Sequence, residues 1–209
     1  MSYNIVDIPW GQEKITTATR RETMLGQVGI TPDGRFHRWA RNGAVALTAG
    51  KLLASAGPVA NHQDLVTAVA AIAAQTVTVT LGATAATLDQ YEDGLLSVRD
   101  LTGEGHGYRI RSNPVVASEG SAVITLRQGD DIRVALDATS QCSLHVNEYN
   151  LVVIAPTTAL GDVVGVSPTA VPINDYFWAQ VSGMAVVLAD TTWVVGQMVE
   201  RSVNVAGAV

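Results

Sequence analysis

Residues 163–199 read VVGVSPTAVPINDYFWAQVSGMAVVLADTTWVVGQMV, and Asp175 and Asp190 are their only charged side chains. Short apolar segments alternate with Gly, Pro and Asn-Asp, which are typical turn residues. Within 177–182 two kinds of side chain alternate, so a pleated strand has an apolar face (Phe177, Ala179, Val181) and an amphipathic face suited to contact (Trp178, Gln180, Ser182). The run predicts a β-rich module that packs against itself or a partner.

The composition of the whole chain favours the same fold class. Of 209 residues, 47% are hydrophobic, 15% charged and 5% aromatic, and Cys142 is the single cysteine. Such a chain can bury a sizeable core of many short strands. An internal disulfide is excluded, so we expect stability to come from packing or oligomerisation.

Strand patterns recur upstream of this run. Residues 76–81 alternate with period two, which places Val77, Val79 and Leu81 inward. The continuous apolar run Leu151–Ile154 predicts a central strand covered on both faces. Further strands are expected at Leu95–Val98, Gly107–Arg111, Val123–Arg127, Ile132–Asp137 and Leu144–Val146. This spacing is typical of a β-sandwich, jelly roll or barrel.

Two other local patterns complete the expected fold. Pro-Asp-Gly at 32–34 and Asn-Gly at 42–43 predict two small hairpins before residue 53. Residues Asn61–Gln75 carry a capping Asn and an apolar stripe at helical spacing, which predicts one short helix. We therefore expect a mainly β protein with a sandwich or jelly-roll-like body and one helix.

The first 23 residues show no sustained period and predict an extended N-terminal arm. Residues 24–209 would form the body, with 24–58 as a possible small sub-domain. Four apolar side chains of the arm would be poorly buried locally, which favours docking on the body or on another subunit over a free tail: Ile5, Val6, Ile8 and Trp10.

Charge is unevenly distributed along the chain. Residues 1–51 hold seven basic and four acidic residues, a net +3, and the remaining six basic and fifteen acidic residues give −9. A mildly basic arm could seek an acidic surface, although ordinary solvated charge is an equal alternative. Because the whole chain is acidic, we expect no nucleic-acid partner. We also expect no secretory signal and no membrane partner, since neither pattern is present.

No motif in the sequence points strongly to a catalytic, cofactor or metal site. Gly103–Gly107 is glycine-rich, but a strand follows it in place of a helix, so a hairpin turn is expected. The acidic residues at 89, 92 and 93 predict a solvated turn, and the pair Asp130-Asp131 after Gly129 is expected to close a turn. Cys142 is expected to be a small, semi-buried hydrophobic residue. The four histidines lie far apart and form no metal motif. We expect no catalytic residue, no metal site and no cofactor.

Four stretches together resemble one group of proteins: Gly34–Leu53, Thr76–Thr84, Gly94–Pro114 and Val164–Gly183. The last keeps an aromatic-Trp-x-Gln-x-x-Gly pattern as Phe177, Trp178, Gln180 and Gly183. In these stretches the chain resembles the capsid decoration, or cement, proteins of tailed double-stranded DNA bacteriophages.

The resemblance implies a non-enzymatic virion protein, made in the host cytoplasm, that binds the major capsid protein on the outside of the mature head. It also implies a homotrimer that bridges neighbouring capsomers. Trp and Arg concentrate interface energy, so the candidate contact residues are Trp10, Arg20, Arg21, Trp39, Trp178, Gln180 and Trp193. For the body tryptophans, burial in the core is an equal alternative.

Two other functions stay open at this point. A tail, baseplate or fibre component that binds a host receptor would also be β-rich and trimeric. A carbohydrate-binding or carbohydrate-active jelly-roll module is the other alternative, because a fold does not fix a function.

Overall fold

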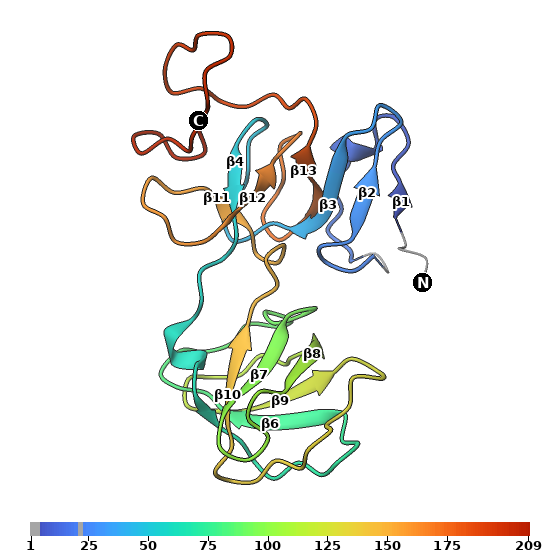
Figure 1. The fold of residues 1–209 in the computed structure, drawn as a ribbon, viewed down its shortest axis with the longest axis vertical. Coiled ribbons are helices and arrows are strands. Elements are labelled where there is room, and N and C mark those ends of the chain that lie inside the picture. The colour runs from blue at the N-terminus through green and yellow to red at the C-terminus, as the bar shows by residue number, and fades with distance from the viewer. Residues whose placement is uncertain (1–4, 21–22) are drawn as a thin grey trace. The chain divides into compact units, whose positions relative to one another are not determined.

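The computed structural model describes residues 5–20 and 23–209, and the chain divides into two compact units. The first, here called the terminal unit, contains the chain up to Gly57 together with Glu148–Val209. The second, the inserted unit, is Pro58–Asn147. Figure 1 shows the strands of each. The prediction of a mainly β fold is confirmed. The boundary at 57 lies next to the end of the possible sub-domain 24–58, but these residues belong to the same unit as the C-terminal third.

The terminal unit is built on one seven-stranded sheet. Its strands lie in the order β1 (Val6–Asp7), β2 (Val28–Ile30), β3 (Phe36–Arg41), β13 (Tyr176–Ser182), β12 (Val163–Val166), β4 (Leu52–Ala54) and β11 (Val153–Ile154). β1 and β2 are parallel, and every other neighbouring pair is antiparallel.

The two central strands, β3 and β13, bury side chains on both of their faces. Ala40, Phe177 and Ala179 lie in one apolar cluster, whereas Trp39 and Trp178 lie in another with Ile8 and Tyr176. Of the amphipathic face predicted for contact, Trp178 therefore packs with Ile8 of the chain's own N-terminal segment, whereas Ser182 is exposed. The N-terminal segment also holds the 3-10 helix η1 (Gln12–Lys14).

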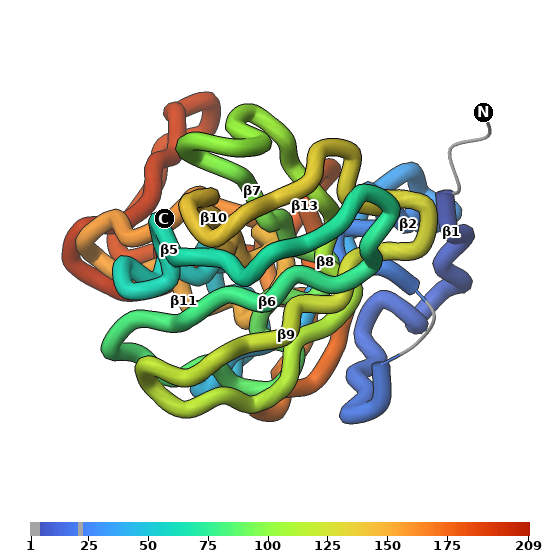
Figure 2. The backbone as a smooth tube through the Cα atoms, turned by 90° about the horizontal axis from the view of Figure 1, so that it is seen from below, coloured from blue at the N-terminus to red at the C-terminus, as the bar shows by residue number. Residues whose placement is uncertain are grey.

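The inserted unit is a six-stranded antiparallel sheet that almost closes on itself. The strand order is β5 (Leu65–Val66), β10 (Gln141–His145), β7 (Leu95–Asp100), β8 (Gly107–Ser112), β9 (Ser121–Leu126) and β6 (Thr76–Thr80). An antiparallel bridge between Thr67 and Val79 joins the two edges, so the sheet is nearly a barrel. Figure 2 shows β10, β5, β6 and β9 running side by side. The inward residues predicted for 76–81 are confirmed, since Val77, Val79 and Leu81 are buried in its core.

A recurring turn motif, not apparent from the sequence, builds both units. In each copy a buried apolar residue bridges its counterpart in another copy through two backbone hydrogen bonds of 2.9–3.0 Å. The chain then turns and enters a strand. In five of the six copies the residue three positions on has a left-handed φ between 53° and 77°. The bridged pairs are Leu47 with Val171, Ala70 with Leu136, and Ala86 with Val116.

The predicted helix over Asn61–Gln75 is wrong. Only the 3-10 turn η2 (Ala60–His62) is helical there, and β5 follows it. The Ala70 and Ala73 amides donate to the distant carbonyls of Leu136 and Ile132, so these backbone groups are not free for a helix. The side chains of Val69 and Ile72, part of the predicted buried stripe, are exposed.

Three further details differ from the sequence-based expectations. Only the first predicted hairpin forms, as β2–β3, because β3 then pairs with β13 and β4 pairs with β12 and β11. The run 151–154 contributes only β11, which lies at an edge of the sheet. Residues 132–137 form no strand and supply one copy of the turn motif at Leu136.

Candidate interaction surface

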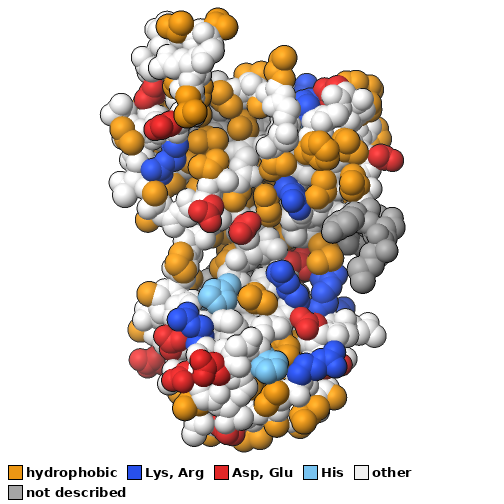
Figure 3. Space-filling view, in the orientation of Figure 1, with side chains coloured by type: hydrophobic (Ala, Val, Ile, Leu, Met, Phe, Trp, Pro, Cys, Tyr) orange, Lys and Arg blue, Asp and Glu red, His pale blue; other side chains and the backbone are white. Residues whose placement is uncertain are grey.

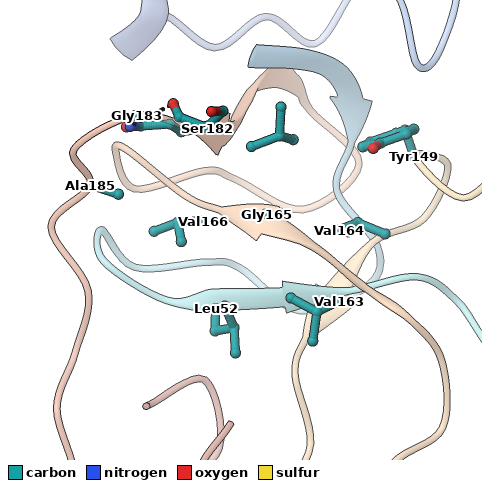
Figure 4. A pocket seen from close by; sticks show the side chains of 11 residues that line it. Leu52, Tyr149, Val163, Val164, Gly165, Val166, Ser182, Gly183 and Ala185 are labelled. Atoms are coloured by element: carbon teal, nitrogen blue, oxygen red, sulfur yellow. Dashed lines mark hydrogen bonds between the residues drawn. The ribbon is translucent and has the colours of Figure 1, made fainter. Parts of the chain in front are cut away.

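An uncharged groove of about 290 Å³ opens on the terminal unit beside β12 and β13. Figure 4 shows its walls, with Leu52 of β4 and Val163, Val164 and Val166 of β12 on one side and Ser182, Gly183 and Ala185 on the other. Tyr149, Gly165, Gln180 and Val181 complete the lining. None of these side chains is a carboxylate or a base, so the groove suits an apolar occupant.

The groove exists because β12 and β13 pair at one register position only, Val166 with Gln180. Gly165 has a φ of 140°, and a Cβ there would lie 2.6 Å from the Gln180 carbonyl oxygen. The Gln180 side-chain amide donates to the carbonyls of Ser182 and Met184, at 3.3 and 2.8 Å. These bonds fix the path of the chain where it leaves β13 and forms the groove wall.

The segment that follows β13 carries ten of the 27 large hydrophobic residues that are exposed in the described chain. Figure 1 shows it as long loops beyond the strands, and Figure 3 shows hydrophobic side chains at the end that protrudes. Exposed apolar side chains that gather on one segment are candidates for contact with another protein. The exposed residues are Met184, Val186, Val187, Leu188, Val194, Val195, Met198, Val199, Val203 and Val205.

The candidate contact residues of the body lie mainly inside the terminal unit. Trp39 and Trp178 are buried and pack edge to face with ring centroids 4.9 Å apart. These two tryptophans therefore belong to the core, which is the alternative that the sequence left open for them. Gln180 is buried too, but its amide shapes the groove wall. Trp193 is half-buried against the cluster that contains Leu52 and Val166.

The arm residues have different surroundings. Trp10 is 62% exposed, next to the buried Ile8. Arg20 is half-buried. Arg21 lies outside the described residues. Neither the groove nor the exposed C-terminal segment includes Trp10 or Arg20, so the six described candidates are not gathered at one place.

The other residues that were considered as catalytic or binding groups have structural roles. The glycine-rich loop 103–107 is the predicted turn between β7 and β8. The acidic turn is not solvated, because Glu92 and Asp93 are buried and Asp93 pairs with Arg127 at 2.7 Å. Cys142 is fully buried in β10, and burial raises the pKa of its thiol to about 12, so it stays protonated.

The buried His62 also has a structural role. His62 bonds through Nδ1 to the Tyr91 hydroxyl and through Nε2 to the Thr84 carbonyl, at 2.8 Å for the latter. Across residues 5–20 and 23–209, no group of three or more His, Cys, Asp or Glu side chains is arranged to hold a metal ion. No helix within those ranges is long and apolar enough to cross a membrane.

Comparison with protein-family models, with curated proteins and with solved structures finds no match to this chain.

Proposed function

We propose that the chain is a virion structural protein that decorates the outside of a tailed-phage head, where a homotrimer binds the major capsid protein. The observation that carries this proposal is the exposed apolar segment 184–205 beside an uncharged groove. Both are suited to contact with other proteins, and the groove holds no charged side chain for a polar substrate.

Decoration also suits the way the apolar surface is distributed. A cement protein adds many modest contacts between capsomers, so extended segments on a rigid β scaffold serve it better than one deep pocket. The terminal unit supplies such a scaffold, since its central strands bury side chains on both of their faces. Its exposed segment leaves that scaffold directly after β13.

Binding to heads is the direct test. Purified protein is mixed with expanded, undecorated heads of the phage, and bound copies per head are measured after sedimentation, together with resistance of the heads to heat. We expect saturable binding at a fixed number of copies per capsomer and a higher temperature of head disruption. Heads that neither bind the protein nor gain resistance contradict the proposal.

Labelling of intact virions separates decoration from the tail alternative. An antibody against the chain should mark the head surface in electron micrographs. Label confined to the tail or its fibres would replace the decoration role with the receptor-binding one. Melting of the protein with a panel of sugars addresses the carbohydrate-binding alternative, for which we expect no shift.

A further inference from the structure

The exposed C-terminal segment contains a defined β-turn at 194–197, and this turn together with Met198 is here called the valine tip (Val194–Met198). The Gln197 amide donates to the Val194 carbonyl at 3.0 Å, and Gly196 has a φ of 88°. A left-handed third residue is the signature of a type II turn. Val194, Val195 and Met198 are 74%, 103% and 83% exposed. The turn therefore presents three apolar side chains that its own chain hardly touches.

Both limbs of the loop that carries the tip are anchored to the terminal unit. Trp193 packs against the Leu52 cluster, and the Arg201 guanidinium donates to the Pro156 carbonyl at 2.7 Å. At the base, Leu188 bridges Ala208, and the Ser202 hydroxyl donates to the Asp190 carboxylate. A tip held in this way loses little conformational entropy when it binds.

The tip does not occupy the groove of its own chain. The groove is lined by residues from β4, β12, β13 and the turn after β13, and by Tyr149, and no residue beyond Ala185 takes part. Because Val195 is fully exposed, it makes no packing contact within its own chain.

We propose that the valine tip of one copy packs into the β12–β13 groove of a second copy. The match is chemical: residues 191–199 carry no charge, and the groove is lined by valines, Leu52 and other uncharged side chains. A charged partner would leave its own charges unpaired against either surface, whereas each surface can bury the other.

The contact joins two different surfaces, so it is head-to-tail. Each copy donates one tip and accepts one, and such contacts close into a ring or continue as a filament. A closed ring of three copies would be the homotrimer of the proposed decoration function, and this detail rests on that function. The tip–groove contact itself concerns only copies of this chain.

Oligomeric state without heads tests the proposal independently of capsid binding. We expect the purified protein to self-associate in sedimentation velocity at micromolar concentration. Val195→Asp places a charge at the centre of the contact and should weaken self-association by at least about tenfold in dissociation constant. Val69→Asp is the matched control, because Val69 is 76% exposed on the inserted unit, and it should leave association unchanged.

Cross-linking between copies tests the geometry. Val195→Cys and Ser182→Cys proteins are mixed and oxidised, and a disulfide-linked dimer of the two is expected on denaturing gels. The native Cys142 is fully buried and does not compete. Val195→Cys mixed with Val69→Cys is the control for random collision and should give far less product.

The outcomes separate cleanly. A wild-type protein that stays monomeric up to about 100 µM, far above the Kd of a specific contact, overturns the proposal. So does self-association that Val195→Asp leaves intact, or cross-linking no stronger than the control. Heads that bind wild-type protein while it stays monomeric in solution would retain the decoration function and reject the tip–groove contact.

Discussion

Gly165 shows how a single position shapes the candidate site. Its φ of 140° belongs to a region that side-chain-bearing residues rarely adopt, and the space for a Cβ is taken by the Gln180 carbonyl. The close approach of β12 and β13 at this point, followed by their separation, produces the groove.

Replacement of Gly165 by alanine should lower the free energy of unfolding of the terminal unit by about 1–3 kcal/mol, from steric conflict and backbone strain. All four tryptophans lie in that unit, so urea unfolding followed by tryptophan fluorescence reports on it. Gly57→Ala is the control in the same unit, because its φ is not left-handed and a Cβ there meets only the Leu160 carbonyl oxygen, at 3.3 Å. Equal effects of the two substitutions would contradict the role given to Gly165.

We expect His37 to make the terminal unit sensitive to acid. Its ring is buried, and neither nitrogen has a hydrogen-bond partner among the described residues. Burial lowers the pKa of His37, with a further lowering from the Arg35 guanidinium, while Glu13 and Asp33 oppose the shift. The folded state therefore holds this side chain neutral where the unfolded chain would take up a proton.

Stability from His37 should be fully present above its unfolded pKa of about 6.5 and be lost as the pH falls below it, by at most about 1.4 kcal/mol per pH unit. Urea unfolding at pH 7.5 and pH 5.5 measures the loss. His37→Gln should reduce the difference when unfolding is followed by tryptophan fluorescence, which reports on the terminal unit; His145, whose pKa burial also lowers, lies in the inserted unit. An unchanged difference in the variant would assign the acid sensitivity to other groups.

Among the elements, the N-terminal segment is an integral part of the sheet in the terminal unit. β1 extends the sheet beside β2, and Thr17 and Tyr176 exchange two backbone hydrogen bonds of 2.8–3.0 Å. Gly29 has no side chain where a Cβ would lie 2.4 Å from Ile8 and 2.8 Å from Trp178. The glycine therefore allows Ile8 to pack next to Trp178.

Ile8→Asp should destabilise the terminal unit by about 3 kcal/mol or more, because it buries a carboxylate among aromatic rings. Ile5→Asp is the matched control three residues away: Ile5 is 46% exposed, so a change within about 0.5–1 kcal/mol is expected. Urea unfolding and protease resistance of the first 20 residues measure both. Equal stability of the two variants would mean that the segment only rests on the surface.

Considered as a whole molecule, the chain places one unit inside the sequence of another. The inserted unit has its own core of 19 buried residues, and its ends lie side by side, since the Gln63 amide donates to the Leu144 carbonyl at 3.1 Å. Its nearly closed sheet leaves few unpaired strand edges, which favours independent folding.

A fragment of residues 58–147 should therefore fold alone and unfold in one cooperative transition. Circular dichroism would show a β spectrum, and amide exchange would be slowest in β7 and β9. A fragment that is unfolded, or that loses its structure without a transition, would show that the terminal unit is needed to hold the barrel. The complementary protein with 58–147 replaced by a short linker tests the other unit.

Parts of this architecture follow from local pattern. The alternation at 76–81 correctly predicts an inward face, because a strand with one buried face must repeat with period two. The predicted helix at 61–75 fails because its backbone bonds to partners about 60 residues away, which no local pattern reveals. The paired turns escape detection for a related reason: each copy shares only one buried apolar residue and a turn of varying sequence.

For the candidate site, too, the sequence reveals some features and not others. The low charge of 163–199 is visible in the sequence and favours contact with protein, yet it does not distinguish the buried Trp178 from the exposed Val195. By itself, the sequence determined strand content, the inward face at 76–81 and the lack of charge. Tertiary structure decided which strands are neighbours, the division into two units, the groove between β12 and β13, and the exposure of Val194, Val195 and Met198, because pairing and burial depend on segments far apart in the chain.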